Sequence, residues 1–128
     1  MAFWTAQTFT AAFLAVLFLQ SGFDKIVDRE GNLGWLKQHF AQSPLAGSVP
    51  FLLSTITVVE LLAGALSGLG TIWLFFGGGP RLAGYGAFFA TLAILMLFTG
   101  QRLAKDYAGA AVLVNYFLLM LAALFLFR

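Results

Sequence analysis

The chain has 128 residues and a formal net charge of +2, with 61% hydrophobic and only 9% charged residues. A soluble domain carries about 25% charged residues, so this chain lacks the polar side chains needed to cover a water-facing surface. Few basic residues and no cysteine argue against a nucleic-acid partner, iron–sulfur clusters and zinc ribbons. We therefore expect an integral membrane protein that contacts the lipid bilayer and holds no metal.

The first apolar run covers residues 4–27 and carries no charged side chain before Asp24. It is too long and too weakly basic at its start for a cleaved signal peptide, so we expect a retained membrane span. At its end, Asp24 and Lys25 are expected to form a charge pair at the membrane interface. The polar run 28–32 that follows predicts a loop.

Residues 32–42 predict a short helix that lies in the membrane interface. Leu33, Leu36 and Phe40 recur at helical spacing, and polar side chains occupy the other faces. His39 belongs to this segment and is expected to be an interfacial side chain, because a metal would find no second histidine in the chain.

Three further apolar runs follow, at about residues 50–76, 81–100 and 107–127. The glycine-rich run 77–80 ends the first of these, and the polar run 101–106 separates the other two. Each apolar run is long enough to cross a hydrocarbon core, which takes about 20 residues. The expected fold is therefore an all-α integral membrane protein, a bundle of four transmembrane helices with a short interfacial helix in the first loop.

The distribution of Lys and Arg predicts the orientation of the bundle. Two basic residues, Arg81 and Arg128, lie on the side of the termini. Five lie on the opposite side, at the end of the first span and in the loops after the first and third spans: Lys25, Arg29, Lys37, Arg102 and Lys105. Because basic loops stay in the cytoplasm, we expect both termini outside, in a bacterial cytoplasmic (inner) membrane.

Glu60 is the ionisable residue deepest within an apolar run. It stands about ten residues into the second span, hence roughly 15 Å below the surface at 1.5 Å per residue. A charge there costs on the order of 3 kcal/mol, so the side chain must pair or face the bundle. The same counting places Gln20, Thr91 and Asn115 at a similar depth, within reach of Lys25. We expect these side chains to form one buried polar layer.

Two interpretations of this layer stay open. Neutral amides and hydroxyls such as those of Gln20, Thr91 and Asn115 ordinarily hydrogen-bond between membrane helices. Glu60 is either part of a functional site, the default interpretation for an ionisable residue at this depth, or the partner of Lys25 in a structural ion pair.

Small residues predict which faces of the spans meet. Gly64 and Gly68 have the spacing that lets two helix backbones approach closely, so we expect them in a helix–helix contact. In the last span a second stripe is expected to face inward: Ala108, Ala111, Asn115 and Ala122.

Two short motifs and one asparagine resemble the DoxX family of small four-helix bacterial membrane proteins. The motifs are Ser21-Gly22-Phe23-Asp24-Lys25 and Val59-Glu60-Leu61-Leu62-Ala63-Gly64, and Asn115 opens the last apolar stretch as in that family. The similarity covers about residues 10–125, so the whole chain, residues 1–128, is expected to be a single DoxX-like domain. The family takes its name from a membrane subunit linked to thiosulfate:quinone oxidoreductase, and its polar positions map onto Lys25, Glu60 and Asn115.

The resemblance implies a small subunit or accessory protein of a larger bacterial membrane complex, redox and quinone-linked. In it Glu60, Lys25, Gln20, Asn115 and Thr91 would form a quinone pocket, with no covalently bound cofactor. The alternative is a structural subunit that packs against partner helices, lipid or pigment. A carrier or channel is disfavoured, because the polar residues form one layer and not a path across the membrane.

Two departures from the family pattern remove protonatable groups. Val114 stands where a lysine is common, and Phe98-Thr99-Gly100 occupies a place where a histidine often occurs. Both departures argue against independent catalysis by this chain.

Overall fold

The computed structural model describes residues 2–128, and within that range it contains only helices and turns. Four helices are long and apolar enough to cross a membrane: α1 (Ala2–Val27), α3 (Val49–Phe75), α4 (Arg81–Leu103) and α5 (Tyr107–Leu126). Two short elements lie between α1 and α3, namely α2 (Arg29–His39) and the 3-10 turn η1 (Ala46–Ser48). The predicted all-helical bundle with a short helix in its first connection is thus confirmed.

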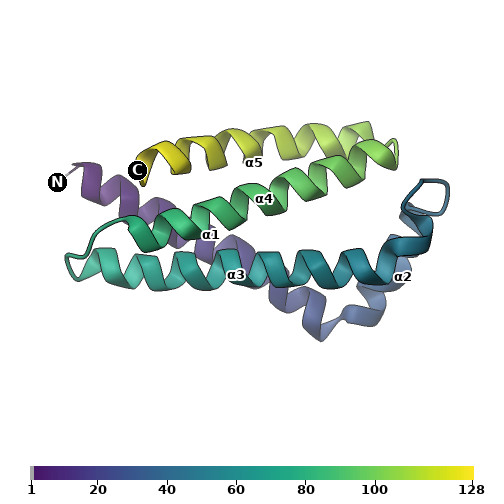
Figure 1. Cartoon of the computed structure of the whole chain (residues 1–128), viewed down its shortest axis with the longest axis horizontal. Coiled ribbons are helices and arrows are strands. Elements are labelled where there is room, and N and C mark those ends of the chain that lie inside the picture. The colour runs from purple at the N-terminus through teal and green to yellow at the C-terminus, as the bar shows by residue number, and fades with distance from the viewer. Residues whose placement is uncertain (1) are drawn as a thin grey trace.

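The bundle has α3 at its centre. This helix packs along both α1 and α4, whereas α5 packs chiefly against α4 and lies at the edge (Figure 1). The start of α1 and the end of α5 lie at one end of the bundle, and α2 lies at the other, together with the α4–α5 turn (Figure 1). Because α5 has one main neighbour, most of its surface faces outward: its buried residues are Ala110, Met120 and Ala123.

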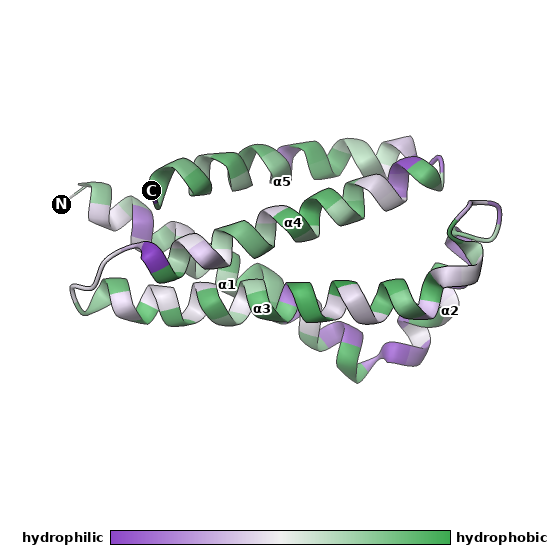
Figure 2. Ribbon diagram, in the orientation of Figure 1, coloured by the Kyte–Doolittle hydropathy of each residue, from purple (hydrophilic) through white to green (hydrophobic). Residues whose placement is uncertain are grey.

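Polar residues concentrate at the ends of the bundle. Figure 2 shows apolar colours along most of the four long helices, and hydrophilic colours over α2 and the α4–α5 turn. Large apolar side chains are exposed on the outer surface, among them Phe9, Val58 and Phe88. This distribution suits a molecule whose sides contact hydrocarbon and whose ends contact water.

The polar run predicted as a loop is the first turn of a helix, so that prediction was wrong. Asp28 is the N-cap of α2, and its side chain accepts a hydrogen bond from the backbone N–H of Gly31 at 3.3 Å. The Asn32 Nδ2 donates to the Asp28 carbonyl at 2.8 Å. Asp and Asn favour loops in general, but at a helix start an Asp such as Asp28 accepts from a backbone N–H that lacks an intrahelical partner.

The other connections follow the expected turn chemistry. Gly77, just beyond α3, has φ +89°, a left-handed conformation that glycine adopts without steric cost. The α4–α5 turn contains Lys105 at φ 61°, and Asp106 then caps α5 by accepting from the Gly109 N–H at 2.9 Å. The glycine-rich end of the second span is therefore confirmed, while α4 runs three residues further than predicted, to Leu103.

Glycines let α3 approach its neighbours closely. A Cβ on Gly64 would lie 2.8 Å from the Leu19 backbone nitrogen of α1, and a Cβ on Gly70 would lie 2.7 Å from the Ala83 backbone of α4. Gly68 differs, because an added Cβ would have Ala15 Cβ at 3.8 Å as its nearest neighbour, an ordinary contact. The close contact of α1 with α3 therefore depends on Gly64 and not on Gly68.

We expect Gly64→Ala to destabilise the bundle relative to Gly68→Ala by about 1–3 kcal/mol, the usual cost of overpacking. Both changes gain the same helix propensity, about 1 kcal/mol, which cancels in the comparison. The measurement is the midpoint of denaturant-induced unfolding of the two variants in detergent. Equal midpoints would contradict the close contact at Gly64.

Candidate functional site

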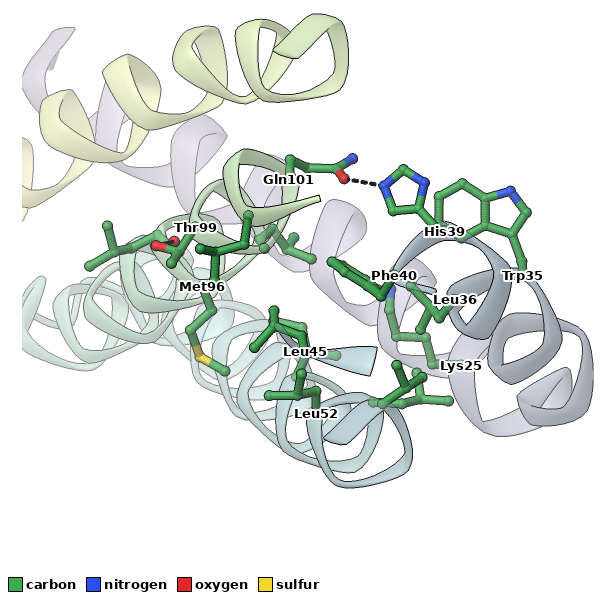
Figure 3. Close-up of a pocket in the computed structure, with 17 residues that line it drawn as sticks. Lys25, Trp35, Leu36, His39, Phe40, Leu45, Leu52, Met96, Thr99 and Gln101 are labelled. Atoms are coloured by element: carbon green, nitrogen blue, oxygen red, sulfur yellow. Dashed lines mark hydrogen bonds between the residues drawn. The ribbon is translucent and has the colours of Figure 1, made fainter. Parts of the chain in front are cut away.

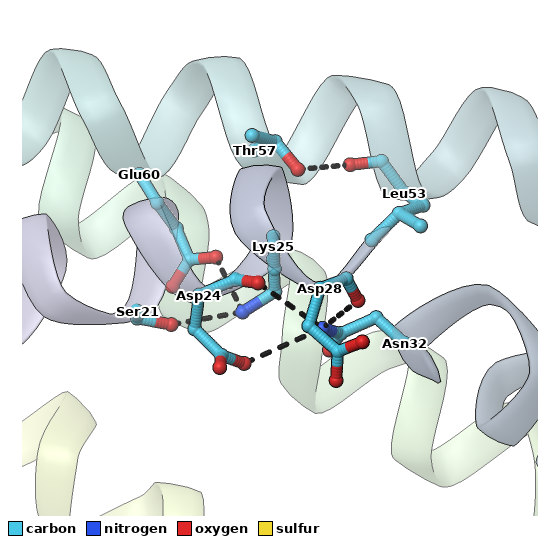
Figure 4. Close-up of polar contacts among 8 residues, drawn as sticks. All are labelled: Ser21, Asp24, Lys25, Asp28, Asn32, Leu53, Thr57 and Glu60. Carbon is cyan, nitrogen blue, oxygen red and sulfur yellow. Dashed lines mark hydrogen bonds and ion pairs between the residues drawn. The ribbon is translucent and has the colours of Figure 1, made fainter. Parts of the chain in front are cut away.

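A buried ion pair joins the two central helices. Lys25 Nζ in the last turn of α1 lies 2.8 Å from Glu60 Oε1 in the middle of α3, and the Glu60 side chain is 2% exposed. The same Nζ donates a hydrogen bond to Ser21 Oγ at 2.8 Å (Figure 4). Lys25 is 16% exposed, so its aliphatic stem is largely covered while its ammonium turns inward.

The neighbouring polar groups make other contacts. Thr57, one turn before Glu60, donates its hydroxyl to the Leu53 carbonyl at 2.6 Å. Asp24 accepts from Asn32 Nδ2 at 3.3 Å and so faces α2 (Figure 4). Within residues 2–128, Asp24 forms no ion pair with Lys25, contrary to the expected interfacial pair. Lys25 pairs with Glu60 instead, because α1 turns this side chain toward α3.

The structure does not assemble the expected polar layer. Gln20 is exposed on α1 and Asn115 is exposed on α5, so neither amide approaches Glu60. Thr91 is half-buried, and its hydroxyl donates to the Ala87 carbonyl of its own helix at 2.7 Å. Counting residues fixes depth along a helix but not the direction in which a side chain points, and among residues 2–128 none of the three side chains hydrogen-bonds to Glu60.

The inward stripe expected in the last span is also wrong. Ala108, Ala111, Asn115 and Ala122 are all exposed, whereas Ala110, Met120 and Ala123 are the residues of α5 that are buried. The buried face of α5 is narrow and two of its three residues are alanines, whereas the outer face carries small residues and also large apolar ones such as Val112, Leu118 and Phe125.

A pocket of about 450 Å³ lies beside the ion pair, between α2, α3 and the end of α4. Its lining is mostly aliphatic and aromatic, and Figure 3 shows Leu45, Leu52 and Met96 among the side chains around it. The polar residues of the lining are Lys25, His39, Thr99 and Gln101. Of the residues predicted for a ligand pocket, Lys25 alone lines this one; Glu60, Gln20, Thr91 and Asn115 do not.

His39 closes one side of the pocket and ties α2 to the α4–α5 end. Its ring stacks on Trp35 at 4.5 Å between ring centroids, and its Nε2 lies 2.6 Å from Gln101 Oε1 (Figure 3). The same Nε2 is 3.6 Å from Asp106 Oδ2, the residue that caps α5. Since Gln101 Oε1 can only accept, a neutral His39 carries its proton on Nε2.

His39, Trp35 and Gln101 were missed as candidate site residues. One signal was available for the first two: they stand four residues apart, on one face of the predicted amphipathic helix. No local signal points to Gln101, because the sequence does not show that this position meets the first connection of the bundle.

The pocket suits a small molecule with an apolar body and a polar group at one edge. Ligand pockets typically have volumes of about 300–1,000 Å³, mostly apolar walls and a few hydrogen-bonding groups. Among residues 2–128 there is no group of three or more His, Asp or Glu side chains that could hold a metal ion. The polar groups that face the pocket therefore offer hydrogen bonding from His39 and Gln101 and positive charge from Lys25.

Comparisons with protein-family models, with curated proteins and with solved structures found no match to this chain. The DoxX resemblance accordingly stays a prediction that depends on the short motifs around Lys25 and Glu60.

We expect Lys25→Met and Glu60→Leu each to lower the free energy of unfolding by about 3–5 kcal/mol, since each leaves a buried charge without its partner. The double variant should be more stable than the sum of the two losses predicts, because it leaves neither charge behind. The measurement is a double-mutant cycle from denaturant-induced unfolding in detergent. Strictly additive losses would show that the two groups do not interact.

Proposed function

We propose that the chain is a DoxX-like integral membrane protein that binds a quinone-class molecule as a small subunit or accessory of a larger bacterial redox complex. The observation that carries the proposal is the apolar pocket of about 450 Å³ with Lys25 and His39 in its lining. The four apolar helices are long enough to cross the membrane, and α2 would then lie in its interface.

The residues of the pocket fit a flat ring with carbonyl acceptors. A lysine ammonium has three donor protons. Lys25 donates one of them to Ser21 Oγ and pairs with Glu60 by charge, so its ammonium still has donor capacity for a ligand carbonyl. His39 offers a second polar contact, and the aliphatic walls accommodate the ring and the start of an isoprenoid tail.

The Lys25–Glu60 ion pair supports this binding site by holding the Lys25 ammonium in place. Among residues 2–128, Lys25 is the one basic residue that forms an ion pair with Glu60. This pair fixes Lys25 at the inner edge of the pocket. A charge in the hydrocarbon region costs on the order of 3 kcal/mol, so separating Lys25 from Glu60 would be unfavourable. Glu60 is thus proposed as a positioning residue and not as a contact of the ligand.

In the proposed orientation the pocket would lie at the cytoplasmic side of a bacterial inner membrane. The pocket shares its end of the bundle with α2 and the α4–α5 turn, and the surplus of Lys and Arg is at that end. In this arrangement the positive-inside rule puts both termini outside. A quinone would therefore reach the pocket from the inner leaflet.

A structural role is the second candidate. The Lys25–Glu60 pair links α1 to α3, two helices that pack closely. A contact that fixes the register of two helices would be placed in this way. Under this interpretation the outer faces of the bundle dock against partner helices, lipid or pigment, and the pocket has no ligand of its own.

Quinone binding is tested by blocking the pocket. Leu52 lines the pocket on α3, and we expect Leu52→Trp to weaken binding of a short-tailed benzoquinone by about tenfold or more, by filling the space the ring needs. Leu62→Trp is the matched control, because Leu62 lies on the same helix, is 41% exposed and is not part of the lining. The measurement is saturable photolabelling by an azidoquinone of the protein in nanodiscs, with labelled residues mapped by mass spectrometry. Labelling that Leu52→Trp leaves unchanged, or that spreads over the outer faces, would contradict the site.

The accessory role is tested by copurification. Extraction in a mild detergent is expected to recover the tagged chain with larger membrane proteins in fixed proportion, because an accessory subunit acts through its partner. Isolation of this chain with no other polypeptide would argue against the accessory role while leaving quinone binding open.

A further inference from the structure

The outer face of α5 carries a polar side chain in the middle of a membrane span. Asn115 is the ninth of the 20 residues of α5, so it stands roughly 12 Å from the start of the helix at 1.5 Å per residue. Its side chain is exposed, and it forms no hydrogen bond with any residue from 2 to 128. In a bilayer this amide would face lipid tails, which offer it neither donors nor acceptors.

Such an amide is normally hydrogen-bonded across a helix–helix contact. A polar group without a partner in hydrocarbon is costly, and asparagine side chains are among those that associate membrane helices. No neighbouring helix of the same chain can supply the partner, because α5 buries its opposite face, with Ala110, Met120 and Ala123, against α4. The partner must therefore come from outside the chain.

Asn115 lies in a seam with heptad spacing. The seam residues alternate at intervals of three and four, and every one of them is exposed: Ala108, Ala111, Asn115, Leu118, Ala122 and Phe125. Positions spaced in this way are the ones that meet when two helices form a left-handed coiled coil. Three of the six are alanines, which allow close approach of backbones in a membrane.

We infer that α5 pairs in parallel with α5 of a second copy of this chain, with Asn115 of one copy hydrogen-bonded to Asn115 of the other. An amide is both donor and acceptor, so two copies of the same side chain complement each other. Two copies in one membrane share an orientation, and a two-fold axis along the membrane normal brings Asn115 of both to the same depth. A single asparagine in such a seam favours the two-stranded parallel form.

This dimer is independent of the pocket. The seam lies on the face of α5 that points away from the bundle, while the pocket is lined by residues from α1 to α4 and by none of α5. Pairing through α5 therefore leaves the pocket, α2 and the Lys25–Glu60 contact unchanged in both copies.

The absence of cysteine from the sequence makes disulfide cross-linking a direct test. We expect Leu118→Cys and Ala111→Cys to form disulfide-linked dimers on mild oxidation of cell membranes that contain the full chain. Val58→Cys and Leu69→Cys are the controls, because both residues are exposed on α3, with exposed fractions of 57% and 56%. Equal cross-linking at the α3 and α5 positions would indicate random collision and would overturn the inference.

Asn115 itself is tested in the Leu118→Cys background. Asn115→Leu should reduce the cross-linked fraction, equivalent to an association about tenfold weaker, through the loss of the interhelical hydrogen bonds. Asn115→Gln should retain part of the cross-linked fraction, because glutamine keeps the amide group. Because Asn115 is exposed and forms no hydrogen bond with residues 2–128, Asn115→Leu is expected to leave the unfolding midpoint of the monomer in detergent unchanged. An undiminished dimer in Asn115→Leu, or a cross-link to a different polypeptide, would overturn the inference.

Discussion

The close approach of α3 to both α1 and α4 determines the rest of the structure. At Gly64 and Gly70 the neighbouring backbones come so near that no side chain would fit between them. That contact brings the last turn of α1 beside the middle of α3, which is why Lys25 can reach Glu60 at 2.8 Å. In hydrocarbon, packing of this kind drives helix association, because lipid tails are as apolar as the side chains and supply no hydrophobic force between helices.

The pocket is a consequence of where this tight packing ends. Toward α2 the helices carry larger side chains such as Leu52, Leu53 and Met96, and the space between α3 and α4 is no longer closed by glycine contacts. The interfacial helix α2 and its His39 cover that space from the side. A bundle held closely at its centre and loosely at one end thus has room for a ligand without any cavity in its core.

Much of the fold could be predicted from the sequence, because apolar runs of about 20 residues and their glycine-rich or polar breaks are strong local signals. The side of each helix that faces the bundle could not be predicted. Gln20 and Asn115 were expected to face the interior of the bundle, but both are exposed, since small and polar residues suit an inner face and an outer contact equally well. The Lys25–Glu60 pair was open to prediction as one of two alternatives, because a buried acid needs a base within reach. The contact of His39 with Gln101 joins residues 62 apart and has no local signal.

The short helix α2 also lies over the pocket. Between Arg29 and His39 no residue is fully buried, and the helix is fastened by hydrogen bonds of Asp28 and Asn32 at its start and by His39 at its end. Elements with few buried contacts open at low free energy, whereas parting α1, α3 and α4 would break the glycine contacts of the core. A molecule bound in the proposed site would therefore enter and leave under α2, and its exchange rate would be governed by the lifetime of the His39 contact with Gln101.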